Sequence, residues 1–145
     1  MKKASKVMTE NPVFCLPNDS VIKAAKLMKS ENIGSIPVVE NEQTRELIGI
    51  VTDRDLVLKI VAEGLDAAST PIDVVMTHKV VTCLADDDLQ KVMDTMSKHR
   101  LRRIPIINKN KTILGMISQA DVALHYDHPK RTAAMVKDIS QANGK

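Results

Sequence analysis

Two short stretches of the chain have the residue types of a helix start that can also hold an anion. Residues 49–56 read GIVTDRDL and residues 115–122 read GMISQADV. In each stretch an apolar strand runs to Thr52 or Ser118, and an Asp follows three positions later, which is the spacing of a helix-capping box. The free N–H groups and the dipole of a helix start also favour phosphate. These stretches are therefore either caps alone or caps that take part in a phosphate site.

The composition excludes several classes of protein. The 145 residues, 43% hydrophobic and 27% charged, suit one compact domain or two small ones that share a core. A net charge of +3 is too small to mark a nucleic-acid binder, and one Phe and one Tyr offer little for base stacking. No apolar run approaches the roughly 20 residues of a membrane span, and no apolar stretch follows the basic N-terminus. With only two cysteines, we expect a cytoplasmic protein with reduced thiols.

An internal repeat organises the chain. Val7-Met8-Thr9 recurs 68 positions later as Val75-Met76-Thr77, and the same displacement takes Ile36-Pro37 to Ile104-Pro105. The displacement then falls to 66, which takes Gly49 to Gly115. The two missing residues lie between two expected strands, where a hairpin turn tolerates their loss. The chain is therefore a duplicated unit.

Each copy reads as β-α-β-β-α. We predict a strand at 13–16, a helix from 21 to about 30, a hairpin of 36–39 and 47–51, and a second helix from Thr52 to near Gly64. The side chains of 18–20 and, in the second copy, of 86–88 are expected to cap the first helices, and Gly34 is expected to end the first helix. Leu56, Val57, Ile60 and Val61 are expected to form one face of this second helix. In the second copy we expect a helix carrying Leu89, Val92, Met93 and Met96, a hairpin of 104–107 and 113–117, and a helix from Ser118.

These elements predict an α+β protein of two repeats. The expected boundaries are 7–64 for the first repeat, 65–71 for a linker, 72–127 for the second repeat and 128–145 for a tail with a short helix from Pro129. A unit of about 55 residues buries little surface by itself. We therefore expect the two sheets to pack face to face about a pseudo-two-fold axis, with the helices outside.

The duplicated pattern of Val-Met-Thr, helix, Ile-Pro strand and Gly-x-x-Thr/Ser-x-x-Asp turn resembles the tandem cystathionine-β-synthase (CBS) domain pair, or Bateman module. The resemblance covers residues 7–124 and is closest to small stand-alone prokaryotic members. It implies a regulatory protein without catalysis or catalytic cofactor. Its ligand would be an adenine nucleotide (AMP, ADP or ATP) or a related adenosyl compound, bound in clefts between the repeats.

The resemblance also implies roles for particular residues. Thr52 and Ser118 would contact phosphate or ribose, and Asp55 and Asp121 would accept hydrogen bonds from ribose hydroxyls. The base would lie on backbone and aliphatic groups of Val13, Ser35, Ile36 and Pro37 in one copy, and of Val81, Arg103, Ile104 and Pro105 in the other. Arg54, Arg100, Arg102 and Arg103 would supply positive charge for phosphates. Because Gly34-Ser35 stands where Arg102-Arg103 stands in the second copy, the two clefts should differ.

Other readings stay open. The arginines could be a solvated helix end, since cations favour a helix C-terminus. Cys15 and Cys83 could be packing residues or a redox pair, and the four histidines form no spaced set of metal ligands. The clefts could be vestigial, so that the chain is a protein-interaction scaffold, or the Arg100–Arg103 patch could bind nucleic acid.

The resemblance also implies a disc-like homodimer, with apolar helix faces that include some of Met28, Leu56, Met93 and Met96 at the contact. The effector protein on which such a sensor would act cannot be named from the sequence.

Overall fold

The computed structural model describes residues 2–143 and divides into two compact units. Unit 1 comprises the described parts of Met1–Asn11, Val81–Asn110 and Leu114–Lys145. Unit 2 comprises Pro12–Val80 and Lys111–Ile113. Each unit therefore contains most of one repeat together with a short segment of the other.

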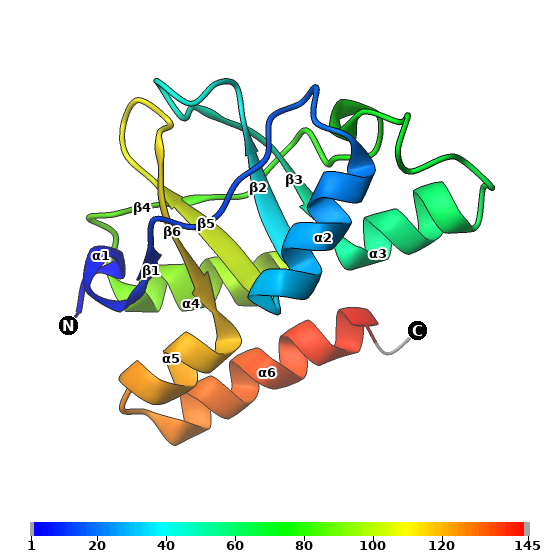
Figure 1. The fold of residues 1–145 in the computed structure, drawn as a ribbon. Coiled ribbons are helices and arrows are strands. Elements are labelled where there is room, and N and C mark those ends of the chain that lie inside the picture. Colours follow the sequence, from blue (N-terminus) through cyan, green and yellow to red (C-terminus); the bar gives the residue numbers. More distant parts are fainter. Residues whose placement is uncertain (1, 144–145) are drawn as a thin grey trace. The chain divides into compact units, whose positions relative to one another are not determined.

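Unit 1 is a four-stranded sheet with helices (Figure 1). Its strands lie in the order β1-β6-β5-β4, with β1 antiparallel to β6 and β4 parallel to β5. Its elements are α1 (Ala4–Val7), β1 (Thr9–Glu10), β4 (Cys83–Leu84), α4 (Leu89–His99), β5 (Arg103–Ile107), β6 (Ile113–Ser118, whose first residue belongs to unit 2), α5 (Gln119–His125) and α6 (Pro129–Asn143).

Unit 2 repeats this plan with less regular edges. The antiparallel hairpin of β2 (Ser35–Val39) and β3 (Leu47–Thr52) forms its centre. Its other elements are α2 (Val21–Glu31), α3 (Asp53–Leu56), the π-helix η1 (Val57–Val61) and the 3-10 helix η2 (Ile72–Val74). Single bridges at Cys15–Val38 and Ile50–Thr77 take the places of β4 and β1. The α+β class and the two repeated sets of elements are confirmed.

The two repeats exchange their Val-Met-Thr segments. Thr9, from the first repeat, pairs with Met116 of β6 in unit 1. Thr77, from the second repeat, pairs with Ile50 of β3 in unit 2 through N–H···O bonds of 2.8 and 3.0 Å. Each repeat thus completes the sheet edge of the other unit.

The start of α2 is capped by backbone and not by the side chains of residues 18–20, so that prediction is wrong. Ser20 occupies the N-cap position, but its side chain makes no capping hydrogen bond. Instead the N–H of Val21 donates to the carbonyl of Thr70 at 2.9 Å. The segment 65–71 therefore supplies a cap to α2, which gives it more than a linking role.

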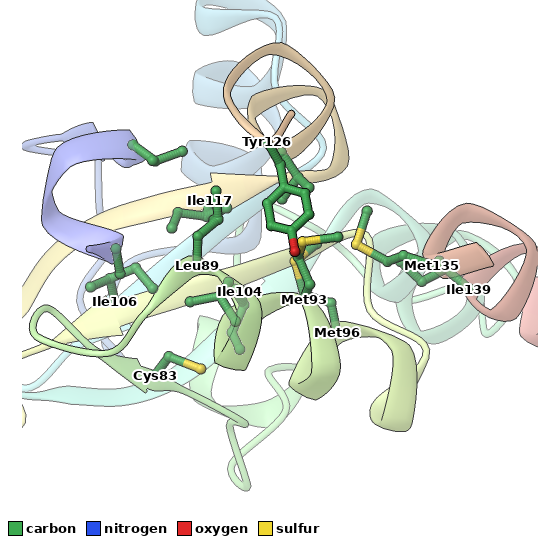
Figure 2. Close-up of a cluster of buried hydrophobic side chains, with 14 residues drawn as sticks. Cys83, Leu89, Met93, Met96, Ile104, Ile106, Ile117, Tyr126, Met135 and Ile139 are labelled. Carbon is green, nitrogen blue, oxygen red and sulfur yellow. The ribbon is translucent and has the colours of Figure 1, made fainter. Parts of the chain in front are cut away.

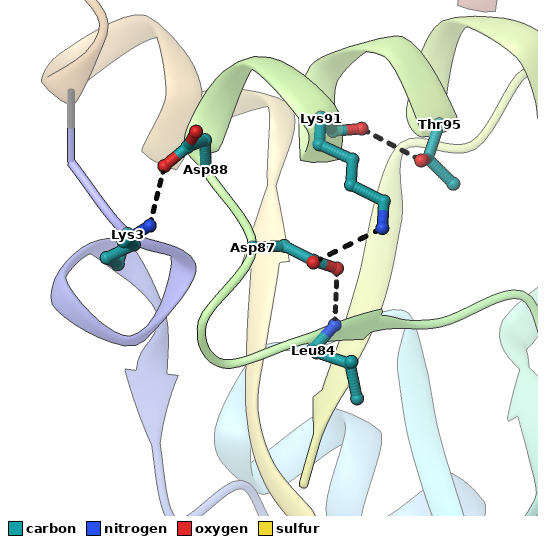
Figure 3. A network of polar contacts seen from close by, with 6 residues as sticks. All are labelled: Lys3, Leu84, Asp87, Asp88, Lys91 and Thr95. Carbon is teal, nitrogen blue, oxygen red and sulfur yellow. Dashed lines mark hydrogen bonds and ion pairs between the residues drawn. The ribbon is translucent and has the colours of Figure 1, made fainter. Parts of the chain in front are cut away.

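The start of α4 is capped in the matching way, so the prediction for residues 86–88 is also wrong. Asp88 makes no side-chain cap, and the N–H of Leu89 donates to the carbonyl of Lys2 at 2.9 Å. Asp88 instead pairs with Lys3 at 3.0 Å, as Figure 3 shows. The N-terminal segment is therefore fastened to the second repeat at a helix start.

Two helix boundaries differ from the sequence prediction. The helix α2 ends with Asn32 in the left-handed conformation (φ 54°), two residues before Gly34. Asn tolerates this conformation because its short polar side chain can bond locally. After Leu56 the second helix widens into η1, where Ile60 is buried but Val57 and Val61 are exposed. The apolar residues predicted to share one helix face therefore differ in burial.

The core of unit 1 is built largely on α4 (Figure 2). Met93 and Met96 are buried there and lie with Met135 and Ile139 of α6. The tail therefore forms a 15-residue helix, longer than the predicted short one, and it covers α4. Met28 is buried in the core of unit 2. Met28, Met93 and Met96 are each part of the core of their own unit, so of the four residues named for a dimer contact only Leu56 is partly exposed.

Gly115 and Gly49 allow the exchanged segments to lie against β6 and β3. A Cβ on Gly115 would be 2.7 Å from the carbonyl oxygen of Thr9, and a Cβ on Gly49 would be 3.0 Å from that of Thr77. We expect Gly115→Ala to lower the free energy of unfolding by about 1–3 kcal/mol through overpacking, and Gly49→Ala by less. Urea denaturation measures both. Wild-type stability in both variants would show that the segments are not held against the strands.

The two thiols give a pH prediction. Burial raises the pKa of Cys15 to about 11 and raises that of Cys83 as well. A raised folded-state pKa contributes stability that is complete below the unfolded value of 9.0 and is lost as the pH rises toward about 11. We therefore expect the free energy of unfolding to fall across this window, and both thiols to resist a thiol reagent at about pH 8 until denaturant is added. Rapid labelling of the folded protein would contradict this.

Candidate functional site

The turn from β3 into α3 forms a complete capping box. The N–H of Asp55 donates to Thr52 Oγ1 at 3.1 Å, and the N–H of Thr52 donates to Asp55 Oδ2 at 2.9 Å. The second carboxylate oxygen, Asp55 Oδ1, lies 3.2 Å from Lys59 Nζ. Both oxygens of Asp55 are thus engaged inside unit 2.

The turn from β6 into α5 has the same geometry and one difference. The N–H of Asp121 donates to Ser118 Oγ at 3.2 Å, and the N–H of Ser118 donates to Asp121 Oδ2 at 2.9 Å. His125 stands where Lys59 stands in unit 2. Within residues 2–143, Asp121 Oδ1 has no ion-pair or hydrogen-bond partner. This carboxylate oxygen is therefore available to an outside hydroxyl donor.

The residues that precede each Ile-Pro strand lie beside these turns. The N–H of Asp53 donates to the carbonyl of Gly34 at 2.9 Å, and the N–H of Gln119 donates to that of Arg102 at 3.0 Å. In unit 2 the Asp53 carboxylate lies against Gly34, where a Cβ would be only 3.0 Å from Oδ2. In unit 1 the corresponding residues are Arg102, which is positively charged, and Gln119, whose side chain is a neutral amide. The two turns therefore have the same shape and different charge.

Positive charge gathers at the second turn. Arg100, Arg102 and Arg103 are exposed, and none of them takes part in an ion pair within the described chain. Arg100 is the left-handed residue (φ 58°) that ends α4. Arg54, in unit 2, is exposed as well but follows the acidic Asp53. Three unpaired guanidinium groups in one short stretch could bind an anion.

The Ile-Pro pairs of β2 and β5 are buried. Ile36 and Ile104 are fully buried in the cores of their units, and Pro37 and Pro105 are buried too. These four residues therefore present little surface to a ligand in this structure. Val13 and Val81 are half-buried.

Ser35 has an unsatisfied hydroxyl at this site. It is opposite Thr52 in the β2–β3 ladder, and its Oγ is buried without a hydrogen-bond partner among the residues described. A buried polar atom without a partner costs free energy, so its place beside the turn is notable.

All seven site residues predicted for the first copy lie in unit 2, and all eight predicted for the second copy lie in unit 1.

Two charged neighbours of the first turn were missed from the sequence. Asp53 faces Gly34, and Lys59 binds Asp55. The contact of Lys59 with Asp55 could have been predicted, because the two residues have the i, i+4 spacing of a helical ion pair. The contact of Asp53 with Gly34 could not, because it depends on how the ends of β2 and β3 pair.

The described residues show no other obvious site. They include no group of three or more His, Cys, Asp or Glu that could hold a metal ion. Among them, no helix has the length and apolar character needed to cross a membrane. Cys15 and Cys83 are free thiols buried in their own units.

Comparison with known proteins decides the family. The sequence model of the CBS domain matches residues 4–62 and again residues 72–128. The chain belongs to the CBS domain family. The chain is 38% identical to the uncharacterized protein YlbB of Bacillus subtilis (strain 168). The alignment covers 100% of this chain and 96% of YlbB.

Solved CBS structures share the fold. Hypoxic Response Protein I, known from Mycobacterium tuberculosis and solved with two coordinated zinc ions, has a TM-score of 0.77 and 27% identity, covering 86% of this chain and 98% of that chain. The CBS domain pair of protein MJ0100, in complex with 5′-methylthioadenosine and S-adenosyl-L-methionine, has a TM-score of 0.74 and 24% identity, covering 86% and 94%. The second likeness is one of fold alone.

Proposed function

We propose that this CBS domain pair is a regulatory module that binds an adenosyl compound, with an adenine nucleotide as its best ligand. The proposal depends above all on one observation. The same hydroxyl-and-carboxylate turn forms in both units, and in unit 1 it combines an uncommitted Asp121 oxygen with three unpaired arginines. The adenosyl ligands of the MJ0100 CBS pair support the ligand class.

The chemistry assigns a part of the ligand to each group of unit 1. A carboxylate oxygen is a strong acceptor for a ribose hydroxyl, which is the proposed role of Asp121 Oδ1. Arg102 and Arg103 would bind phosphate oxygens, and Arg100 would add positive charge. The base would lie near the half-buried Val81 and the exposed Arg103, beside the start of β5.

The two units should select different ligands. In unit 2, Asp53 would repel a phosphate, and Lys59 already occupies Asp55 Oδ1. We therefore propose that the site in unit 2, with Thr52, Ser35 and Arg54, binds more weakly and favours an uncharged adenosyl compound. A regulatory signal then requires that a ligand binds two shapes of the protein with different affinity.

The module is proposed to act as a dimer of identical chains in the cytoplasm, without catalysis, on an effector protein. The cytoplasmic setting agrees with two cysteines that are free in the fold.

Thermal unfolding with single ligands tests the proposal. The panel is AMP, ADP, ATP, GTP, 5′-methylthioadenosine and S-adenosylmethionine. A ligand at 100 times its dissociation constant should stabilise the fold by about 2.7 kcal/mol. We expect a raised midpoint with adenosine compounds and none with GTP. If no compound raises the midpoint, the clefts are vestigial and the exposed arginines favour the scaffold function.

Matched variants assign the binding groups. Asp121→Ala should abolish the shift with AMP, whereas Asp138→Ala, which removes an exposed carboxylate from α6 in the same unit, should leave it unchanged. Removing Arg102 and Arg103 should weaken AMP binding but spare uncharged 5′-methylthioadenosine. Full AMP binding by Asp121→Ala, with only the roughly 1 kcal/mol of stability that a cap contributes lost, would reduce the turn to a helix cap.

A further inference from the structure

Lys59 joins the turn in unit 2 to the exchanged segment that completes the same sheet. Its Nζ lies 3.2 Å from Asp55 Oδ1, on the capping box, and donates to the carbonyl oxygen of Val75 at 2.8 Å. Two residues later, the N–H and the carbonyl of Thr77 bond with Ile50 of β3. One side chain therefore holds a proposed ligand-binding carboxylate and a segment of the other repeat at the same time.

The carbonyl of Val75 depends on this lysine. Val75 is buried and directly follows the 3-10 helix η2, and the carbonyls at a helix end lack a partner inside the helix. Among the described residues, Lys59 Nζ is the only group that donates to this carbonyl. A buried carbonyl without a donor is costly, so loss of the Lys59 bond weakens the attachment of residues 75–77 to unit 2.

The matching position in unit 1 lacks this link. With the displacement of 66, Lys59 corresponds to His125. With the displacement of 68, Val75 corresponds to Val7. The side chain of His125 is exposed at the end of α5, and within residues 2–143 it forms no hydrogen bond or ion pair. The fold itself therefore does not require the link, which distinguishes the two turns in connection as well as in charge.

The helix around Lys59 is unusual at the same place. In the π-helix η1, the N–H of Ala62 donates to the carbonyl of Val57, and just beyond it the N–H of Leu65 donates to that of Ile60, each across five residues. The corresponding helix of unit 1, α5, is an ordinary α-helix. Turns of π-helix are rare and occur frequently at functional sites. This second feature of unit 2 coincides with the position of Lys59 at the centre of η1.

We infer that Lys59 couples occupation of the unit 2 turn to the segment of residues 75–77. A ribose hydroxyl that donates to Asp55 Oδ1 takes the acceptor that Lys59 uses. The ammonium group then has one fixed acceptor in place of two, and its side chain, which is 46% exposed, gains conformational freedom toward water. The carbonyl of Val75 loses its donor for part of the time, and the hydrogen bonds between Ile50 and Thr77 open more often.

This inference rests on the proposed ligand site in unit 2 and adds the residue that transmits its occupation. It also gives a reason for weaker binding there, because the ligand competes with an ammonium group for one carboxylate oxygen. The link between Lys59 and the exchanged segment exists without ligand, so it can be measured separately from binding.

Amide hydrogen exchange without ligand tests the link. Lys59→Met keeps the aliphatic stem and removes the charge. It should make the amides of Ile50 and Thr77 exchange about five-fold faster, the order expected for one partly exposed charge-assisted hydrogen bond. Lys26→Met removes an exposed lysine of α2 that forms no ion pair within the described residues, and it should leave both rates unchanged. Wild-type rates in Lys59→Met would overturn the inference.

An internal reference separates local opening from a loss of global stability. The N–H of Val39 donates to the carbonyl of Cys15 at 3.0 Å in the same unit, away from the exchanged segment in the chain. Its exchange rate should not change in Lys59→Met. Equal acceleration at Val39 and Thr77 would show that Lys59 only stabilises the unit, which contradicts a coupling role.

A double-mutant cycle tests whether Asp55 and Lys59 act as one link. Asp55→Asn removes the charge that attracts Lys59 and retains a side chain that can cap α3. It should speed exchange at Thr77 to a similar extent as Lys59→Met, and the double variant should exchange no faster than either single variant. Additive effects would show that the two residues act independently and would overturn the inference.

Uncharged 5′-methylthioadenosine is the probe for the ligand step. In the wild type it should speed exchange at Thr77, although binding usually slows exchange. Lys59→Met should bind it about five-fold more tightly, followed by the amide shifts of Thr52 and Asp55, and should show no further change at Thr77. Binding at the turn that leaves exchange at Thr77 unchanged would overturn the inference. If no adenosyl compound binds, the proposed function fails, while the ligand-free cycle still decides whether the turn and the segment are linked.

Discussion

Each unit depends on a backbone segment that the other repeat supplies. The hydrogen bonds between Ile50 and Thr77, and the pairing of β1 with β6, complete the two sheet edges. The segments that lead into the exchanged ones provide the helix caps, because Thr70 caps α2 and Lys2 caps α4. An uncovered strand edge and an uncapped helix start are both costly. A single repeat would leave both open, which explains why the unit occurs as a pair.

The completed sheets fix the positions of the β3–α3 and β6–α5 turns, but they do not determine which charged residues lie beside each turn. The capping boxes at Thr52 and Ser118 agree within 0.1 Å in both of their hydrogen bonds. The neighbours do not agree, since Asp53 borders one turn and Arg102 the other. Duplication has thus kept the geometry, while the charges differ: the first turn carries both signs and the second carries the unpaired arginines. The capping bonds stabilise the helices whether or not a ligand is present.

The sequence predicted what local patterns and the repeat determine. The hairpins, the capping boxes and the α4 core residues follow from residue types and spacing, and the family was identified from a resemblance of the duplicated motifs. The caps of α2 and α4 could not be predicted, because the bonding groups are carbonyls more than 45 residues away in the chain. The π-helix after Leu56 was not predicted, because an α-helical period does not describe it. The covering of α4 by α6 was missed because the tail has no counterpart in the repeat.

The central claim is that the turn in unit 1 is a ligand site and the turn in unit 2 a weaker one. Titration of the ¹⁵N-labelled protein with AMP, followed by amide chemical shifts, tests it most directly. The account predicts that the amides of Arg103, Ser118 and Asp121 change at a lower AMP concentration than those of Ser35, Thr52 and Asp55. Changes that begin in unit 2, changes confined to residues outside both turns, or no change at millimolar AMP would contradict it.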